Sequence, residues 1–491
     1  MSMMDEIQGV QKRKLLFLNI ACLLIIAYFT VLTCRQIIYA TPVYDNDYKT
    51  FYISLRKPLD VYSEHFYVRV LAYANVKENE ITTTNAKTSP TLSAVNMNTP
   101  TMCFILKGLV NISNSLSVNA LAWSFSALFC AALSLYVLLR LFKTLSLWYY
   151  LPLLLLLFLS WPSLSALKLG QVSYFILPFF SIAFLLVNLK HWRSAAVVFA
   201  LLASLKLFFL IFFLFFVAKR NWRLSLLFVG SFLFFFFLPV IYFHWAVYHD
   251  FFRMAQNEYL VVSHSTFPMN GSLLGVVARL VTVFNLPSYM PQLRLSIIIL
   301  SLYVLIRWLI YDYYFLRSLP EFSDELRVSF LIVLGLLLSP LAWIYYFLFL
   351  LIPVVVFFKI SARYALSKTF FIFFILALAL PYFAWMSSVY KTVWYVQNFS
   401  SAASLVCWLI CVFSAANSVC RANPPLKKNR EILFAILCLT VLLNVILLHL
   451  NYGMPYFLDL NKKNYIQNTM PAISIRKDDM TKMLMIKPGE K

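Results

Sequence analysis

The carboxylates that follow the first apolar run of the chain are well placed for acid–base chemistry. Asp45 and Asp47 lie in an aromatic-rich stretch, Tyr44–Tyr52, shortly after the apolar run 15–32. A carboxylate at a membrane–water boundary can accept the proton of an incoming hydroxyl, so this stretch is predicted to hold a general base. Two alternatives remain: the acids only solvate the end of a membrane span, or Asp60, Glu64 or His65 further along the same loop acts as the base.

A lysine in the apolar stretch LLASLKLFFLIFFLFF is the second candidate. Burying an ammonium group in hydrocarbon is costly unless the group is paired or solvated. A lysine near the end of a span can extend its side chain to the interface, but Lys206 lies near the middle of its run with no acidic residue close in sequence. A cavity that holds an anion would compensate this charge, so Lys206 is predicted to bind an anionic group.

Polar or aromatic residues also occur where other apolar runs end. Gln171 precedes a new run, and a helix beginning after it would direct its N-terminal amides to that side, where they can bind an anion. Asn270 and Arg279 lie close together in another such segment. The segment Ser339–Tyr346 breaks an apolar run at a proline, and an aromatic belt at the membrane interface is its simpler interpretation.

The elements that position these residues must be membrane-spanning helices, because the composition excludes a soluble protein. The 491 residues are 62% hydrophobic and 12% charged, whereas soluble chains are about 45–50% apolar and about 25% charged. Lysine and arginine (41) outnumber the acids (19) and punctuate the apolar runs. This pattern is typical of cytoplasmic loops and not of a nucleic-acid-binding surface. We predict an all-α polytopic membrane protein with about 11 to 13 transmembrane elements.

The basic clusters also predict the topology. Lysines and an arginine before the first run place the N-terminus in the cytoplasm. The run 194–218 has a basic cluster at each end, so a single crossing would put one cluster on the wrong side. A re-entrant hairpin resolves the conflict, with its tip near Ser204–Leu207 and Lys206 at the tip. The extended loop 35–116, the loop 246–292 and the tail 451–491 then fall outside the cytoplasm.

Several kinds of site are disfavoured by the sequence. The chain has only nine glycines and no phosphate-binding glycine motif, and its short cytoplasmic loops leave no room for a nucleotide-binding domain. Its six histidines show no metal-ligand spacing, and no CxxC pair occurs. An enzyme of this kind must act on a substrate that is lipid-borne or extracytoplasmic.

Taken in order, these segments resemble glycosyltransferase family 87, integral-membrane enzymes of the GT-C fold that use polyprenyl-phosphate sugars. The matching elements are Asp47-Tyr48-x-x-Phe51-Tyr52, Asp60-Val61-Tyr62, Asn98-Thr99-Pro100, Leu169-Gly170-Gln171-Val172, Ala203-Ser204-Leu205-Lys206, Asn270 to Arg279, and Ser339-Pro340 with Trp343. Two departures replace a proline of the family, at Thr99 and Leu207. A third places Tyr345-Tyr346 where the family has a histidine pair, which puts in doubt the roles assigned to that position.

The resemblance implies sugar transfer with inversion from a polyprenyl monophosphate donor, mannose being the family's commonest sugar. Asp47 would deprotonate the acceptor hydroxyl, Lys206 and Arg279 would neutralise the leaving phosphate, and Gln171 would bind the phosphate or sugar. Further candidates for substrate binding are Asp45, Asp60, Tyr52, Asn270, Trp343, Tyr345 and Tyr346. No metal and no cofactor are expected. The expected partners are membrane lipids, the polyprenyl-phosphate-linked sugar and a glycan or glycolipid acceptor, with no nucleic acid.

The expected organisation is a catalytic membrane domain over 1–360, transmembrane helices over 361–450 and a polar extracytoplasmic tail over 451–491. The expected location is the plasma (inner) membrane, with the N-terminus cytoplasmic and the C-terminus outside. A transporter or flippase of lipid-linked sugar is the main alternative, but it predicts charges in several spans and an internal repeat, and no repeat is evident. A non-catalytic scaffold subunit is the other alternative, and it requires Asp47 to be dispensable.

Overall fold

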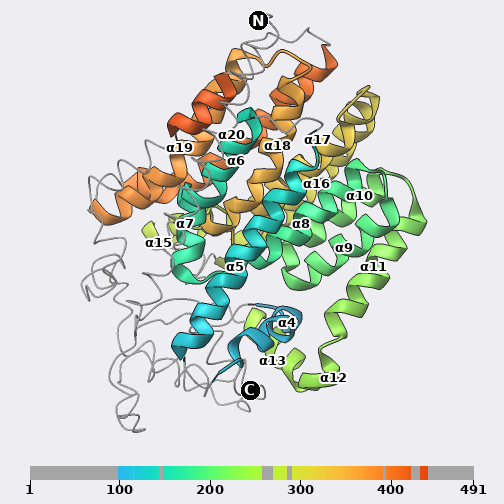
Figure 1. The fold of residues 1–491 in the computed structure, drawn as a ribbon, viewed down its shortest axis with the longest axis vertical. Helices are drawn as coiled ribbons and strands as arrows, with labels where there is room; N and C mark the ends of the chain where they lie inside the picture. Colours follow the sequence, from blue (N-terminus) through green and yellow to red (C-terminus); the bar gives the residue numbers. More distant parts are fainter. Residues whose placement is uncertain are drawn as a thin grey trace, which may run out of the picture.

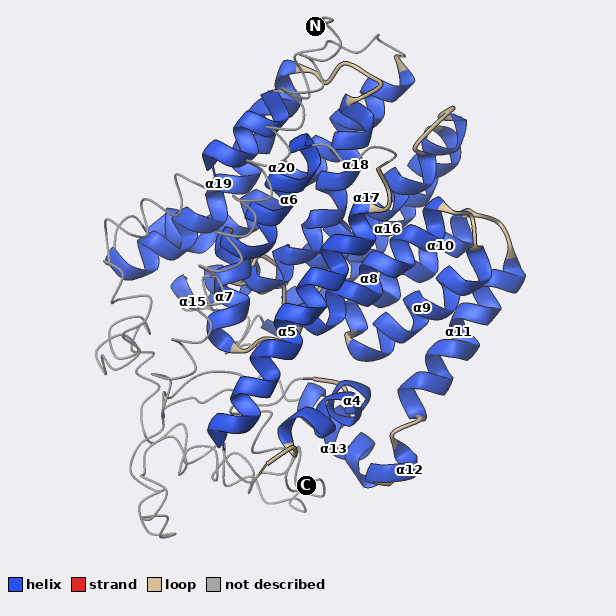
Figure 2. Ribbon diagram, in the orientation of Figure 1, coloured by secondary structure: helices blue, strands red, loops and turns tan. Residues whose placement is uncertain are grey.

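The computed structural model describes residues 98–113, 116–142, 147–256, 269–284, 290–390, 394–421 and 432–440. Regular structure in these ranges is helical, and the one β-type pairing among them is an isolated antiparallel bridge between Asn270 and Trp343. The prediction of an all-α membrane protein is confirmed (Figures 1 and 2). The first apolar run, Asp45, Asp47, Tyr52, Asp60 and the tail 451–491 lie outside the described residues.

The helices follow the apolar runs of the sequence closely. The first half of the described chain contains α4 (Pro100–Val110), α5 (Leu116–Leu139), α6 (Leu147–Leu159), α7 (Trp161–Leu169), α8 (Ser173–Asn188), α9 (Trp192–Leu205), the 3₁₀ helix η3 (Leu207–Phe212), α10 (Phe213–Ala218), α11 (Trp222–Phe237), α12 (Val240–Phe243) and α13 (Ala246–Gln256). The second half contains α15 (Leu273–Val283), α16 (Met290–Tyr314), η5 (Leu316–Ser318), α17 (Ser323–Leu338), η6 (Ile344–Leu350), α18 (Leu351–Ser361), α19 (Lys368–Tyr390) and α20 (Trp394–Cys420).

Some described helices are long and apolar enough to cross a membrane, and others are too short to do so alone. The five long ones cover Val118–Leu139, Trp222–Phe243, Gln292–Ser318, Ile344–Ser361 and Phe399–Cys420. Shorter apolar helices include α8 and α9. The predicted run 146–167 is one that breaks: it forms α6 and α7, which are separated at Ser160 just before a Trp-Pro pair. A proline is tolerated in the first turn of a helix but cannot continue a preceding one.

The predicted hairpin is present in the structure. The ammonium nitrogen of Lys219, just after α10, lies 4.1 Å from the ring centroid of Trp192 at the start of α9. Both ends of the run 194–218 therefore lie at the same end of the molecule, and the chain reverses between them at Lys206. The 14 residues of α9 span about 21 Å, which is less than the ~30 Å hydrocarbon thickness of a bilayer.

Aromatic side chains hold the two arms of the hairpin together and against the neighbouring helices. Phe199 of α9 stacks on Phe212 of η3 with ring centroids 4.4 Å apart. Phe180 of α8 and Phe349 of η6 both contact Phe209, with ring centroids at 5.4 Å and 5.3 Å, and they also contact each other at 6.0 Å. These rings are fully buried, so the phenylalanine-rich sequence after Lys206 forms the core between α8, α9 and η6.

The end of the predicted loop 35–116 contains a helix that the sequence interpretation did not anticipate. Residues 100–110 form α4, with Thr99 as its N-cap and Pro100 in its first turn. Met102, Cys103, Leu106 and Val110 are buried on one face, which is the spacing of an amphipathic helix. The helix start signal was present in Thr99-Pro100, but the polar residues before it made the whole segment read as a loop.

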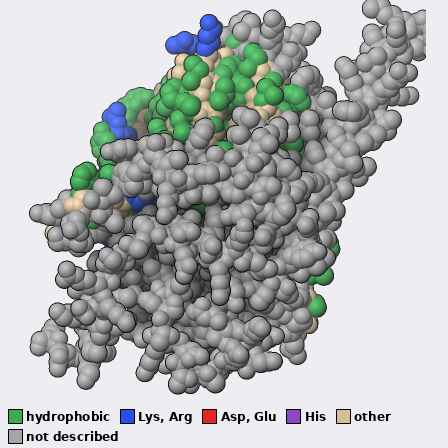
Figure 3. All heavy atoms as spheres, turned by 90° about the vertical axis from the view of Figure 1, so that its left-hand side faces the viewer, with side chains coloured by type: hydrophobic (Ala, Val, Ile, Leu, Met, Phe, Trp, Pro, Cys, Tyr) green, Lys and Arg blue, Asp and Glu red, His purple; other side chains and the backbone are tan. Residues whose placement is uncertain are grey.

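The described surface is apolar, as expected of a protein surrounded by lipid. On α16, Ile298, Leu302 and Ile306 are exposed. Figure 3 shows another face of the molecule, on which the described side chains that are visible are mostly hydrophobic. Lys or Arg side chains lie at the top of this view and also farther down on its left. Large exposed apolar surfaces would be unstable in water and indicate contact with a membrane.

Candidate functional site

Lys206 lies at the reversal of the hairpin, between two helices. Its backbone is extended (φ −145°, ψ 115°), which ends α9, and η3 begins at the next residue. Its amide donates to the Leu202 carbonyl (2.9 Å), and its own carbonyl accepts from the Phe209 amide (3.0 Å). The side chain is half-buried, so a cation projects from a rigid turn without being sealed in the core.

Aromatic residues of η6 form the surroundings of this lysine. The Lys206 ammonium nitrogen lies 5.3 Å from the ring centroid of Tyr346, within the range of a cation–π interaction. Tyr345 packs against Tyr346 and lies nearly parallel to Trp343, with centroids 6.0 Å apart. Tyr346, the second residue of the pair Tyr345-Tyr346, therefore contacts the lysine predicted to bind the phosphate.

Asn270 joins two segments that are far apart in the sequence. Its side-chain oxygen accepts from the Ala342 amide (2.8 Å) and the Ser272 amide (3.1 Å), and its side-chain nitrogen donates to the Pro340 carbonyl (3.2 Å). Backbone bonds from Gly271 to Ala342 and from Ile344 to Met269 complete the pairing. Asn270 is fully buried. Its described contacts fix the loop before η6, and its predicted substrate contact stays a prediction.

Arg279 is attached to the same junction. Its guanidinium Nη1 donates to the Asn270 carbonyl at 3.0 Å, and the side chain is buried. Burial lowers the pKa of Arg279 to about 10, because desolvation disfavours the charged form. The group nevertheless remains protonated at neutral pH. Arg279 thus brings a positive charge to the base of the Asn270 junction, and its predicted contact with the donor phosphate stays a prediction.

Gly275 is required for the close packing of this junction. A Cβ atom added there would lie 2.9 Å from the Asn270 side-chain carbon and 3.1 Å from its carbonyl oxygen. We expect Gly275→Ala to lower the stability by about 1–3 kcal/mol, because the Asn270 amide is held in place and cannot move aside. Thermal unfolding in detergent measures the effect. Gly108→Ala is the control, since a Cβ there meets no atom within 4 Å; equal midpoints for both variants would contradict the prediction.

Gln171 follows a tight helix end. Gly170 adopts the left-handed conformation (φ 63°) that ends α7, and the Gln171 amide donates to the Ala166 carbonyl at 2.8 Å. This is the arrangement that glycine permits at a helix C-terminus. The predicted new helix begins at Ser173. Gln171 is buried, and no described contact joins it to Lys206.

All five ion pairs found among the described residues lie near the base of the hairpin, at the end opposite Lys206. They are Lys219–Asp324 (2.5 Å), Arg327–Asp312 (2.5 Å), Arg327–Asp324 (2.8 Å), Lys359–Glu325 (2.9 Å) and Arg363–Glu321 (2.5 Å). We call the first four the basal ion network. Every acidic side chain that the structure describes takes part in one of these pairs. Within the described residues, Lys206 therefore has no carboxylate neighbour, and an anionic ligand could approach it.

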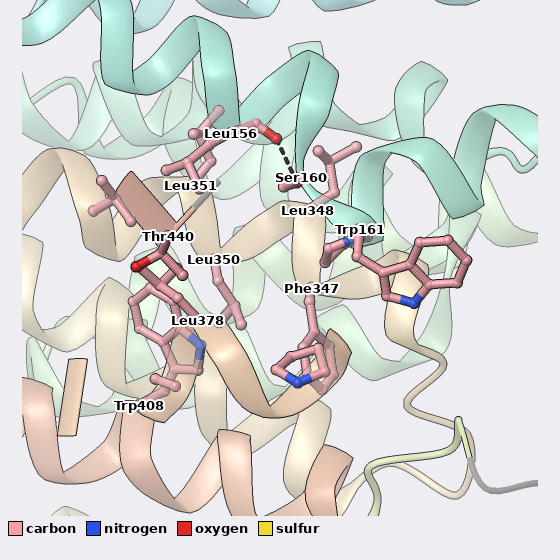
Figure 4. A pocket seen from close by; sticks show the side chains of 14 residues that line it. Leu156, Ser160, Trp161, Phe347, Leu348, Leu350, Leu351, Leu378, Trp408 and Thr440 are labelled. Carbon is pink, nitrogen blue, oxygen red and sulfur yellow. Dashed lines mark hydrogen bonds between the residues drawn. The ribbon is translucent and has the colours of Figure 1, made fainter. Parts of the chain in front are cut away.

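A separate apolar pocket lies between α6, α7, η6, α18, α19 and α20 (Figure 4), with a cavity volume of about 50 Å³. Phe347, Trp161 and Trp408 contribute to its lining. The hydroxyl of Ser160 donates to the Leu156 carbonyl and is thus engaged within the protein. None of the predicted site residues lines this pocket, and its lining contains no charged side chain. It is therefore unsuited to a phosphate.

Among the described residues, no group of three or more His, Cys, Asp or Glu residues is positioned to hold a metal ion.

Thr99 lies near the site, and its contacts could not be predicted from the sequence. Its hydroxyl reaches the backbone next to Lys206, more than a hundred positions later in the chain. The only signal in the sequence was that Thr99 belongs to the element Asn98-Thr99-Pro100, which resembles a family motif.

The family model of glycosyltransferase family 87 matches residues 110–340. The matched region contains Gln171, Lys206, Asn270 and Arg279, and it ends at Pro340, which accepts a hydrogen bond from Asn270. No curated protein and no solved structure matches the chain.

Proposed function

We propose that the chain, whose residues 110–340 match the family model of glycosyltransferase family 87, is a membrane glycosyltransferase of that family. In this proposal it transfers a sugar from a polyprenyl-phosphate donor to a lipid or envelope glycan acceptor. The proposed sugar is mannose, by resemblance to the family. The proposed location is the extracytoplasmic face of the plasma membrane, with the N-terminus in the cytoplasm and the C-terminus outside. The observation that carries the proposal is the position of Lys206 at the tip of a hairpin.

The hairpin geometry supports a lipid-borne anionic substrate. If the base of the hairpin lies at the cytoplasmic boundary, arms of about 21 Å place the tip inside the ~30 Å hydrocarbon layer. A half-buried ammonium group at that depth needs a counter-charge. The described carboxylates lie at the opposite end of the molecule. The phosphate of a membrane-embedded lipid supplies the charge at the required depth.

In the proposed reaction the acceptor oxygen attacks the anomeric carbon of the sugar from the face opposite the phosphate. The bond between that carbon and the phosphate oxygen breaks, and the configuration inverts. Asp47 takes the proton of the acceptor hydroxyl, and the donor leaves as polyprenyl monophosphate. Lys206 and Arg279 stabilise the negative charge that develops on the phosphate, and the leaving phosphate needs no general acid.

Further residues are proposed to bind the donor or the acceptor. Gln171 is proposed to hydrogen-bond to the phosphate or sugar. Trp343, which is only partly buried, together with Tyr345 offers an aromatic face against which the apolar side of a sugar ring can pack. Tyr52, Asp45 and Asp60 are proposed to bind the acceptor or the sugar from the first outer loop.

The test is transfer from radiolabelled polyprenyl-phosphate mannose by purified protein, with a membrane extract as the source of acceptor. Asp47→Asn should reduce transfer by about a hundredfold or more, because it removes the general base, while donor binding survives. Glu80→Gln is the matched control, because Glu80 is an acidic residue of the same predicted loop without a proposed role, and it should retain most activity. Equal transfer by wild type and Asp47→Asn would remove the assignment of Asp47. Protein-dependent movement of the lipid across vesicles without transfer would instead favour a flippase.

A further inference from the structure

We propose that Thr99 is a positioning residue: its hydroxyl caps the end of α9 and thereby holds the hairpin tip that presents Lys206. The inference rests on the proposed function of Lys206, and it assigns a role to an uncharged residue that was not among the predicted site residues.

The contacts of Thr99 converge on the two residues that precede the lysine. Its hydroxyl lies 2.6 Å from the Ser204 carbonyl and 3.1 Å from the Leu205 carbonyl. The same hydroxyl oxygen accepts from the Met102 amide in the first turn of α4. One side chain therefore caps the start of α4 and the end of α9.

The end of α9 depends on such a partner. The last carbonyls of a helix have no intrahelical donor and must be satisfied by another group or by water. Ser204, Leu205 and Thr99 are all buried, so water does not readily replace the hydroxyl. A buried carbonyl without a partner is destabilising. The extended conformation of Lys206 therefore depends on a donor that arrives from α4.

Thr101 provides a natural comparison within the same helix. Its hydroxyl donates to the Phe235 carbonyl at 3.1 Å, near the end of α11, and it is as buried as Thr99. The start of α4 thus caps two helices, and of these two hydroxyls it is that of Thr99 that bonds to the hairpin tip. Loss of either hydroxyl removes a similar buried hydrogen bond, and only the loss of Thr99 should disturb Lys206.

The first experiment is hydrogen–deuterium exchange of the purified protein without donor. In Thr99→Val, the peptides that contain the Lys206 and Phe209 amides should exchange about tenfold faster than in wild type. Thr99→Ser keeps the hydroxyl and should exchange like wild type. Thr101→Val should leave these peptides unchanged. Unchanged exchange in Thr99→Val, or equal acceleration by Thr101→Val, would overturn the cap.

The second experiment is a double-mutant cycle in the transfer assay. Thr99→Val should lower transfer about tenfold in wild type, with Thr99→Ser restoring it, and should have little further effect in Lys206→Ala, because the residue acts through the lysine. Independent, multiplying losses would overturn the positioning role. The hydrogen–deuterium exchange experiment needs no sugar donor. Absence of sugar transfer by the wild-type protein would contradict the proposed function. The exchange result would still decide whether Thr99 holds the hairpin tip.

Discussion

Replacing Lys206 with alanine should lower sugar transfer by about 100- to 1000-fold, the loss observed when a preorganised electrostatic partner of a developing charge is removed. In the proposed reaction the phosphate gains negative charge as the sugar leaves. Among the described residues, the acidic side chains form ion pairs at the other end of the hairpin and none pairs with Lys206. Because the backbone of Lys206 is hydrogen-bonded on both sides of the turn, the ammonium group is already positioned and needs to move little during the proposed reaction.

The measurement is the ratio of kcat to KM with the radiolabelled donor. Lys368→Ala is the matched control, since Lys368 is exposed at the start of α19 and lies outside the hairpin; it should behave like wild type. Lys206→Arg keeps the charge and should retain more activity than Lys206→Ala. Wild-type transfer by Lys206→Ala would refute the assignment of the phosphate site to the hairpin tip.

The largest expected effect on stability is at Arg327 in the basal ion network. Its guanidinium donates to Asp312 on α16 and to Asp324 in the first turn of its own helix, and the Arg327 and Asp312 side chains are only 4% and 3% exposed. Arg327→Leu would leave Asp312 buried without its ion-pair partner. Breaking a buried ion pair from one side costs about 3–5 kcal/mol. We expect thermal unfolding in detergent at a clearly lower temperature.

The exposed pair Arg363–Glu321 is the comparison for this variant. Its side chains are 52% and 42% exposed, and exposed ion pairs contribute about 0–1 kcal/mol because water and salt screen them. Arg363→Leu should therefore unfold close to wild type. An equal decrease in the unfolding temperature of both variants would contradict the prediction that burial determines how much an ion pair contributes to stability. Arg327→Leu with Asp312→Leu should recover part of the loss, because no buried charge is left unpaired.

The basal ion network also has a consequence for the hairpin. Asp324 contacts both Arg327 and Lys219, and Lys219 follows the second arm of the hairpin. The base of the hairpin is thus tied to α17, while its tip is held by Thr99 of the first loop. The hairpin is thus held at its base and at its tip, about 21 Å apart, and Lys206 lies beside the attachment at the tip.

The sequence by itself determined the helical architecture, the main runs and the hairpin. Those features follow from hydropathy and from basic residues at the ends of runs, which are local properties. The basic clusters on both sides of 194–218 were sufficient to predict a reversal at Lys206, because a single crossing would have placed one of them on the wrong side. The match to the family model of glycosyltransferase family 87 could likewise be anticipated from ordered short motifs.

The tertiary structure alone decided which residues meet. Thr99 bonds to Ser204, Asn270 to Ala342, and Lys219 to Asp324. No local pattern predicts such pairs, because each depends on how separate helices pack. For the same reason the helix α4 was not predicted, because the packing of its apolar face against α9 and α11 cannot be seen in the sequence. The sequence identified the charge at the hairpin tip, and packing between distant segments decided what holds that charge in place.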